Sequence, residues 1–481
     1  VLPAESLYAI EHDTMDTTFR SMYQGLYIYL SARKERRDLL LSQRPPRFDE
    51  SLDSMISRSE DDFTRIALKA KAAQDYFLLI GPPGTGKTSC ALKKMVETFH
   101  ADKDAQILLL SYTNRAVDEI CKSLASIAPA VDFIRVGSEL SCDEAYRGHL
   151  IENELSSCNR RSEVYERIRN CRIIVGTVAA ISGKPELFRL KHFDVAIIDE
   201  ATQILEPQLL GILCARGEDG KDAIDKFVLI GDHKQLPAVV QQNTEQSAIY
   251  DESLLSIGLT NLKDSLFERL YRNCTATVHR SYDMLCRQGR MHPEVALFAN
   301  RAFYGGRLIP VGLPHQIESS DTICRLAFYP SVPEKAGASA KINYSEARIV
   351  ADLAVRIYED HQTDFDESRT LGIITPYRSQ IALIKKEIES LGIPALNRIL
   401  VDTVERFQGS ERDVIIYSFC VNYPYQLKFL SNLTEEEGVL IDRKLNVALT
   451  RARKQMFITG VSELLERNPL YKSLLKLIES F

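Results

Sequence analysis

The segment Gly81-Pro82-Pro83-Gly84-Thr85-Gly86-Lys87-Thr88 decides the fold of this chain. It follows an apolar run at residues 76–80 and precedes a helical pattern at residues 91–99. A glycine-rich loop between a strand and a helix is typical of phosphate-binding loops, because glycine lets successive backbone N–H groups point at phosphate oxygens. The helix N-terminus adds a partial positive charge. A tight turn without a ligand is the alternative, but such a turn needs no lysine.

This loop predicts a role for each of its side chains. We expect Lys87 to reach the terminal phosphates of a nucleotide and the Thr88 hydroxyl to hold Mg²⁺. The other residues expected around the phosphates are Pro83, Gly84, Thr85, Gly86 and Ser89.

The second half of a nucleotide site is expected where the apolar run 195–198 ends in two carboxylates. Asp199 would hold Mg²⁺, directly or through water, and Glu200 would orient or deprotonate the attacking water. An acidic pair after a strand is common at protein surfaces. It is much rarer downstream of a phosphate loop, so we favour the catalytic interpretation.

Composition limits the class of protein. The chain has 481 residues, enough for about three domains, and its 45% apolar and 26% charged residues are typical of globular proteins. The formal net charge of −6 means that any nucleic-acid contact must come from a local groove. Ten scattered cysteines form no Cys-x-x-Cys pair and indicate neither a zinc site nor a disulfide framework. We expect these cysteines to be reduced and mostly buried, which predicts an intracellular protein, cytoplasmic, or nuclear in a eukaryote. No membrane span or signal peptide is visible.

The order of predicted elements gives an α/β protein with two sheet domains in tandem. Residues 1–60 predict a helical stalk, in which apolar residues such as Phe19 and Leu26 recur at helical spacing and the basic run at 33–37 is interpreted as a solvated helix face. Short apolar runs then predict parallel strands at 76–80, 107–111, 133–136, 172–176, 195–199 and 226–230, and again at 324–329, 371–375, 398–401, 413–419 and 455–459. We therefore expect domains at 61–280, with a helical insertion at about 141–170, and at 281–481.

Five further segments resemble the motifs of one helicase family. They are DEATQ at 199–203, GDHKQLP at 231–237, RMHP at 290–293, and the segments at 401–413 and 445–453. In order and kind they are similar to superfamily I helicases, in the subgroup of the nonsense-mediated-decay RNA helicase and the replication helicase-nuclease. The resemblance covers residues 76–460. It implies two tandem RecA-like P-loop NTPase domains with parallel sheets, and ATP and Mg²⁺ as ligands.

The resemblance also implies roles in catalysis. ATP would bind between the domains, with Gln235 on the γ-phosphate or the attacking water and with Arg290 and Arg451 as arginine fingers from the second domain. Glu411 would meet the ribose hydroxyls, and Gly409 would allow close approach. The implied activity is ATP-dependent 5′–3′ translocation on single-stranded nucleic acid.

The same family places a nucleic-acid track on strand ends of both domains. The residues that match it are Thr113, Asn114, Thr177, Pro237, Thr375, Pro376, Tyr377 and Thr403. Threonines at such positions bind phosphate without reading sequence, although each one alone would be interpreted as a helix cap. DNA is favoured over RNA as the track. An RNA-remodelling helicase and an ATP-switched nucleic-acid clamp remain alternatives.

Two positions depart from the family pattern. Thr64 stands where an adenine-reading glutamine is usual, and Gly289 stands where a tyrosine often stacks on the base. Both changes predict relaxed nucleobase selectivity. Residues 1–60 show no β-barrel pattern and no nuclease carboxylate cluster, so we expect a barrel or nuclease domain of the relatives, where one exists, to lie upstream of Val1.

Overall fold

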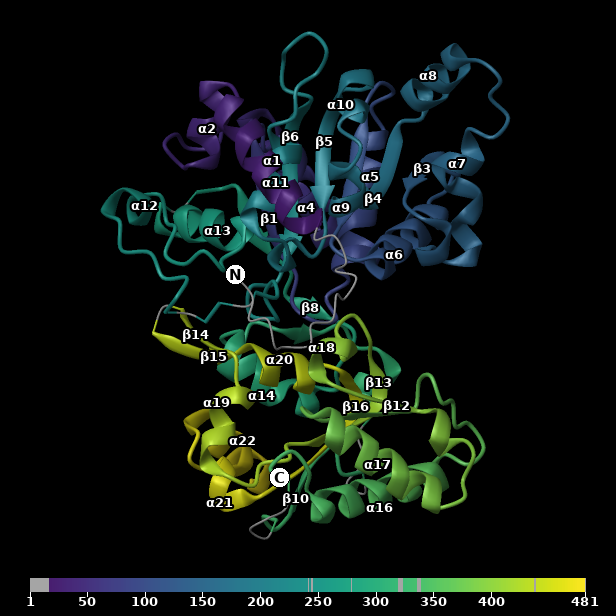
Figure 1. Cartoon of the computed structure of the whole chain (residues 1–481), viewed down its shortest axis with the longest axis vertical. Helices are drawn as coiled ribbons and strands as arrows, with labels where there is room; N and C mark the ends of the chain where they lie inside the picture. Colours follow the sequence, from purple (N-terminus) through teal and green to yellow (C-terminus); the bar gives the residue numbers. More distant parts are fainter. Residues whose placement is uncertain are drawn as a thin grey trace, which may run out of the picture.

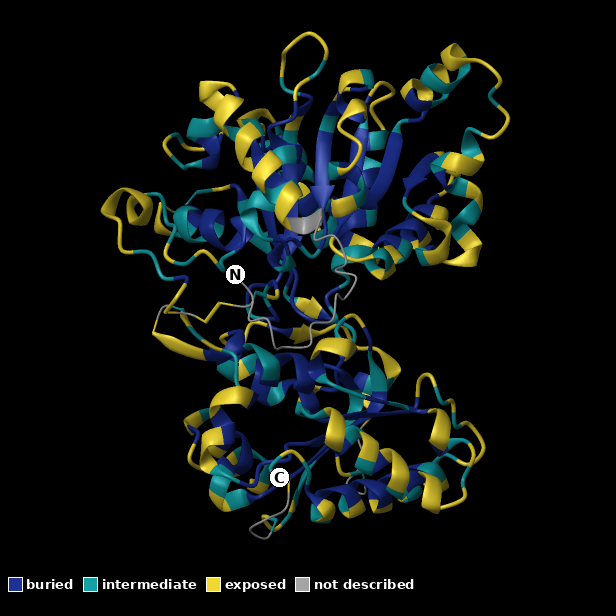
Figure 2. Ribbon diagram, in the orientation of Figure 1, coloured by how far each residue is buried: buried dark blue, intermediate teal, exposed yellow. Residues whose placement is uncertain are grey.

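The chain forms two parallel β-sheets, one above the other, each covered by helices on both faces (Figure 1). The computed structural model describes residues 17–480 apart from 241, 244, 278, 319–322, 335–338 and 437. Most strands of the two large sheets are deeply buried, as Figure 2 shows in dark blue. The expected architecture of two tandem α/β domains is confirmed.

The first sheet has seven strands in the order β3-β4-β2-β5-β6-β1-β7. Its strands are β1 (Tyr76–Ile80), β2 (Ile107–Ser111), β3 (Phe133–Val136), β4 (Ile173–Thr177), β5 (Phe193–Ile198), β6 (Ile224–Gly231) and β7 (Tyr282–Met284). The sequence predicted all of them except β7, which pairs in parallel with β1. The sheet therefore extends past residue 280, and the domain boundary expected there lies too early.

Helices cover both faces of this sheet because their apolar stripes complete two separate cores. One face packs against α4 (Asp62–Ala72), α5 (Lys93–His100) and α6 (Asn114–Ala125). The other packs against α2 (Lys34–Leu40), α9 (Val178–Ser182), α10 (Glu186–Leu190), α11 (Glu206–Leu213) and α13 (Leu266–Ala276). The expected insertion between β3 and β4 is helical, with α7 (Ile151–Glu154) and α8 (Arg161–Asn170).

The second sheet has five strands in the order β10-β16-β13-β11-β12. They are β10 (Leu326–Pro330), β11 (Leu371–Ile374), β12 (Leu400–Asp402), β13 (Arg412–Ser418) and β16 (Ala452–Gly460). One face carries α14 (Pro293–Phe303), α20 (Arg443–Leu449), α21 (Ser462–Leu465) and α22 (Pro469–Glu479), and the other carries α16 (Tyr344–Asp360) and α17 (Arg378–Ser390). All five strands were predicted.

Two small strand pairs were not expected from the sequence. The strands β8 (Arg287–Gln288) and β9 (Ile309–Pro310) pair near the cleft between the sheets, and β14 (Leu433–Glu436) and β15 (Val439–Asp442) form an antiparallel hairpin. The hairpin contacts the first domain, because Glu436 Oε2 lies 2.9 Å from Nε2 of His233. It therefore helps to hold the two domains together.

The N-terminal segment differs from expectation in two ways. In α1 (Thr17–Ser31) the predicted apolar residues Phe19 and Leu26 are 58% and 39% exposed, because the face that packs on α11 is centred on Gly25. Arg36 is buried rather than solvated, and its guanidinium donates to the Ile224 carbonyl at 2.5 Å. The predicted helix before residue 17 lies outside the described residues. Among those described, no helix is long and apolar enough to cross a membrane.

Asp75 ties the segment after α2 to the start of β1. Its carboxylate accepts hydrogen bonds from the side chains of Arg44 and Arg47 and from the backbone N–H of Arg47, at 2.7–3.1 Å. Burial alone would raise the pKa of Asp75, but these partners hold it well below its usual range. The carboxylate is thus ionised and paired at neutral pH.

We predict that Asp75→Asn lowers the free energy of unfolding by about 1–3 kcal/mol at pH 7. The depressed folded-state pKa stabilises the fold above the unfolded pKa of about 4, and this contribution is lost as the pH falls through the folded-state value. Urea unfolding at several pH values measures the difference, which should shrink below pH 4. Asp104→Asn, at an exposed aspartate, is the control. Equal stability of Asp75→Asn and the control at pH 7 would contradict the assignment.

Candidate active site

The phosphate-binding loop joins the carboxyl end of β1 to a helical segment that begins at Lys87. Gly84 and Gly86 have φ values of +73° and +74°, which glycine adopts without strain. The Thr85 hydroxyl donates to the Pro82 carbonyl at 2.7 Å and closes the loop from inside. The loop therefore has the curled backbone that the sequence predicted.

Four predicted catalytic and metal-binding side chains meet beside this loop. Nζ of Lys87 lies 2.6 Å from Oε1 of Glu200, and the Thr88 hydroxyl donates to Oδ2 of Asp199 at 2.5 Å. A hydroxyl oxygen and a carboxylate oxygen so close together are suitable ligand atoms for the Mg²⁺ ion of a nucleotide site. Glu200 has a φ of +54°, a strained conformation for a residue with a β-carbon, and strain of this kind clusters at functional sites.

The charges of these groups depend on one another. Burial opposes the charge of Lys87, but Glu200 and Asp199 outweigh it and raise the pKa of the ammonium group. Burial raises the pKa of Asp199, whereas Lys87 overcomes burial at Glu200 and lowers the pKa of that carboxyl. The lysine is therefore the counter-ion of the acidic pair.

The second domain reaches directly into this loop. The Gly289 backbone N–H donates to the Gly84 carbonyl at 2.8 Å. A β-carbon on Gly84 would lie 2.4 Å from Cβ of Arg290, so only glycine permits this contact. Nε of Arg290 lies 2.5 Å from Oε2 of Glu411, so the two residues expected to bind different parts of ATP are paired with each other here.

Arg451 enters the site from the end of α20. Its guanidinium is 2% exposed and donates to the side-chain carbonyl of Gln235 at 3.2 Å. Burial, together with the neighbouring charge of Arg290, lowers the pKa of Arg451 to about 9. The group still carries its charge at neutral pH, so it remains available to a phosphate.

All predicted nucleotide-site residues line one cleft of about 1540 Å³ between the two domains. Those residues are Pro83, Gly84, Thr85, Gly86, Lys87, Thr88, Ser89, Asp199, Glu200, Gln235, Arg290, Gly409, Glu411 and Arg451. The sequence reasoning missed further basic residues on the cleft wall, among them Arg115, Arg406 and Arg412. Arg406 and Arg412 lie inside the segment at 401–413, whose resemblance to a helicase motif was the signal that could have revealed them.

The residues predicted to form the nucleic-acid track do not all lie in this cleft. Thr113 and Pro237 line the cleft, whereas Asn114, Thr177, Pro376, Tyr377 and Thr403 lie outside it. Thr113 and Thr177 accept hydrogen bonds from backbone N–H groups and cap α6 and α9. The side chain of Thr375 is fully buried and its backbone N–H donates to the Asp402 carbonyl at 3.1 Å, so this side chain is not exposed to a nucleic acid in this conformation.

Thr64, which stands where an adenine-reading glutamine is usual, is not among the residues that line the cleft. The Thr64 hydroxyl donates to the Asp61 carboxylate at 2.5 Å, as part of the N-cap of α4. The cleft lining includes Phe63, Leu285, Arg287 and Val311 beside Gly289, together with the acidic residues Glu60, Asp61 and Asp62. The apolar side chains and the arginine offer faces on which a base can stack.

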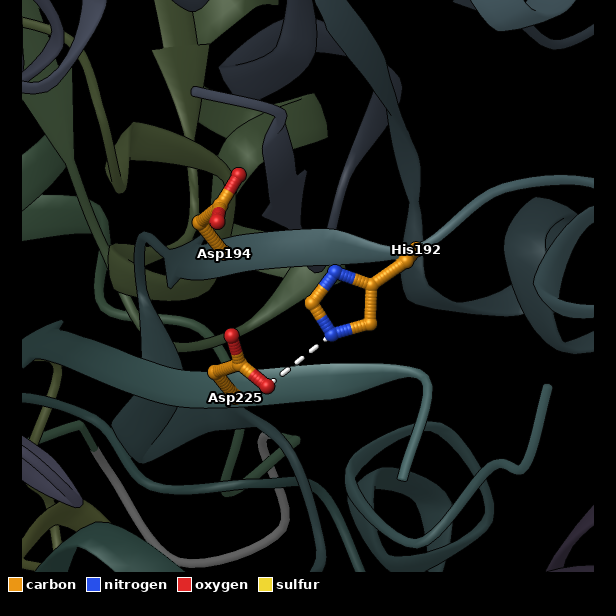
Figure 3. Close-up of side chains that lie close together, drawn as sticks. All are labelled: His192, Asp194 and Asp225. Atoms are coloured by element: carbon orange, nitrogen blue, oxygen red, sulfur yellow. Dashed lines mark hydrogen bonds and ion pairs between the residues drawn. The ribbon is translucent and has the colours of Figure 1, made fainter. Parts of the chain in front are cut away.

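A separate group of possible metal ligands lies at the amino ends of β5 and β6. In Figure 3 the His192 ring faces Asp225, with Nε2 of the histidine 2.9 Å from Oδ1 of the aspartate. The third member, Asp194, accepts a hydrogen bond from the Gln106 backbone N–H at 2.6 Å. Parallel sheets bind their ligands at the carboxyl ends of the strands. His192, Asp194 and Asp225 lie at the amino ends and are not among the residues that line the nucleotide cleft.

Comparison with known proteins agrees with the motifs. Two family models, both described as AAA domains, match residues 262–463 and residues 58–164 with 151–243. The chain is 28% identical over 502 residues to the DNA replication ATP-dependent helicase/nuclease of Gallus gallus, covering 100% of this chain and 45% of the relative. It is 24% identical over 536 residues to the DNA polymerase alpha-associated DNA helicase A of Saccharomyces cerevisiae, covering 95% and 73%.

The chain belongs to the superfamily I helicases. The family resemblance drawn from the motifs is therefore confirmed. The chain spans less than half the length of the chicken helicase/nuclease. Among solved structures, the arterivirus nonstructural protein 10 helicase matches with a TM-score of 0.42 at 15% identity, covering 86% of this chain and 64% of that chain.

We predict that this superfamily I helicase discriminates among ATP, GTP, CTP and UTP by less than about 10-fold, because sites that read a base by hydrogen bonds reach far larger ratios. Competition of each nucleotide against a fluorescent ATP analogue measures the affinities. Thr64→Val should leave them unchanged, since the Thr64 hydroxyl is engaged by Asp61. A strict preference for ATP, lost in Thr64→Val, would show that this hydroxyl does read the base.

Proposed function

We propose that this chain is an ATP-hydrolysing motor that moves 5′ to 3′ along single-stranded DNA. The observation that carries the proposal is the shared cleft, in which the phosphate loop of one domain meets two arginines of the other. A site divided between two domains changes when they move apart, so hydrolysis and domain motion become one cycle.

In this proposal the first domain binds the phosphates. Lys87 leaves Glu200 for the β- and γ-phosphates, whose negative charge exceeds that of one carboxylate. The released Glu200 then accepts a proton from the attacking water, which Gln235 helps to orient. Thr88 and Asp199 would hold Mg²⁺, which neutralises charge on the phosphate oxygens when bound. Pro83, Gly84, Thr85, Gly86 and Ser89 supply the surrounding loop.

The second domain stabilises the charge that develops during phosphoryl transfer. Arg290 and Arg451 approach the γ-phosphate with bidentate donors, and an arginine finger is typically worth about 10³–10⁵ in rate. Glu411, released from Arg290, becomes free to accept hydrogen bonds from the ribose hydroxyls. Gly409 lies beside it in the cleft and leaves room for the nucleotide.

DNA is the favoured track because the similar proteins are named DNA helicases. The proposed contacts are Thr113, Asn114, Thr177, Pro237, Pro376, Tyr377 and Thr403, with Thr375 contributing only after the local backbone rearranges. The polarity follows from the family subgroup. Such a motor acts inside the cell, and in the nucleus in a eukaryote.

We predict that single-stranded DNA stimulates ATP hydrolysis, and that Lys87→Ala and Arg451→Ala each reduce the stimulated rate at least about 10³-fold. Lys103→Ala and Arg467→Ala, which remove exposed side chains of the same types, serve as controls and should hydrolyse ATP normally. Parallel assays with single-stranded RNA separate the two tracks. Greater stimulation by RNA would favour the RNA-remodelling alternative, and unstimulated hydrolysis would favour the switched clamp.

Polarity is tested with tailed duplexes. We predict displacement of the complementary strand from a duplex with a 5′ single-stranded tail and little displacement from one with a 3′ tail, because a 5′–3′ motor reaches the duplex only from a 5′ tail. A blunt duplex is the control for spontaneous melting. Displacement from the 3′-tailed substrate alone would reverse the proposed direction.

A further inference from the structure

A buried polar group joins the two domains just behind the proposed catalytic side chains. Oδ2 of Asp232 accepts two hydrogen bonds, from the Tyr304 hydroxyl at 2.7 Å and from Nε2 of Gln235 at 2.8 Å. Asp232 and Gln235 belong to the loop after β6 in the first domain, whereas Tyr304 follows α14 in the second. One carboxylate oxygen therefore connects a residue of the second domain to a catalytic candidate of the first.

A residue of the second domain also holds the Tyr304 hydroxyl in place. Nδ2 of Asn446 donates to the Tyr304 oxygen at 2.8 Å and to the Lys234 carbonyl of the first domain at 2.7 Å. Tyr304, Asp232 and Asn446 are each at most 1% exposed. Burial and the charge of Asp232 raise the pKa of Tyr304 well above its usual value, so the hydroxyl keeps its proton and acts as the donor to the carboxylate.

This network determines which way the Gln235 side chain faces. Because its amide nitrogen donates to Asp232, its amide oxygen is the atom that points at Arg451, 3.2 Å from Nη2. An amide can be turned over with little change in shape, so its orientation depends on the partners that it finds. Loss of one donor to Asp232 would loosen the carboxylate and, through it, the amide.

We propose that Tyr304 is a positioning residue for ATP hydrolysis, which holds Asp232 so that the Gln235 side chain faces Arg451 and the γ-phosphate. The inference rests on the proposed function of Gln235. The tyrosine hydroxyl reaches Asp232, and Asn446 reaches the Lys234 carbonyl, only when the domains are in contact. The orientation of Gln235 therefore reports domain closure. Hydrolysis is then restricted to the closed arrangement.

The test is Tyr304→Phe, which keeps the ring and removes the hydroxyl. We expect kcat of DNA-stimulated ATP hydrolysis to fall about 10- to 100-fold, the range for one hydrogen bond to a charged group, while KM changes less than about 3-fold. We also expect weaker binding of ADP–aluminium fluoride with unchanged binding of ADP. That readout needs no turnover, so it tests the inference even where the isolated chain hydrolyses no ATP and the proposed motor function fails.

Two comparisons separate positioning from a general loss of stability. Tyr471→Phe removes a similar hydroxyl, which donates to Asp442 at 2.9 Å within the second domain, and should leave kcat unchanged. In a Gln235→Ala background, Tyr304→Phe should cause little further loss, because its effect passes through that side chain. The proposal is overturned if Tyr304→Phe changes neither kcat nor the affinity for ADP–aluminium fluoride. It is also overturned if both phenylalanine variants lose equal activity, or if Tyr304→Phe causes its full loss of kcat in the Gln235→Ala background.

Discussion

The active cleft depends on the contact between Gly84 of the phosphate loop and the segment that carries Arg290. The Gly289 N–H and the Gly84 carbonyl lie within hydrogen-bonding distance, and a β-carbon at Gly84 would collide with Arg290. This approach places the arginines of the second domain beside a loop built for phosphates. The proposed catalytic effect of the second domain follows from it, because charge stabilisation by arginine requires contact distances.

Charge balance stabilises this close arrangement of basic and acidic side chains. Lys87 is paired with Glu200, and Arg290 is paired with Glu411. These carboxylates offset cations that would repel one another in a partly buried cleft. A nucleotide triphosphate would take over as counter-ion and release both carboxylates for their own roles, so binding and activation of the site become one event.

The sequence predicted the two large sheets well, because their central strands are continuous apolar runs that are buried on both faces. It missed β7, which has only three residues and includes Asp283, and the β14–β15 hairpin, whose first strand carries Glu435 and Glu436. The nucleotide-site residues could be predicted because they occur inside motifs. The Asp232–Tyr304 hydrogen bond could not, since the two residues lie in different domains and neither one shows its partner from spacing alone. The burial of Arg36 likewise depends on how α2 packs on the sheet.

The central claim is that both domains build one catalytic site around the γ-phosphate. A crystal structure of the chain with ADP, aluminium fluoride, Mg²⁺ and single-stranded DNA tests it most directly. The account predicts that Arg290 and Arg451 both lie within hydrogen-bonding distance of the fluoride ligands, with Lys87 released from Glu200 and Arg290 released from Glu411. Arginines that remain on Glu411 and Gln235, away from a fully occupied nucleotide site, would contradict it.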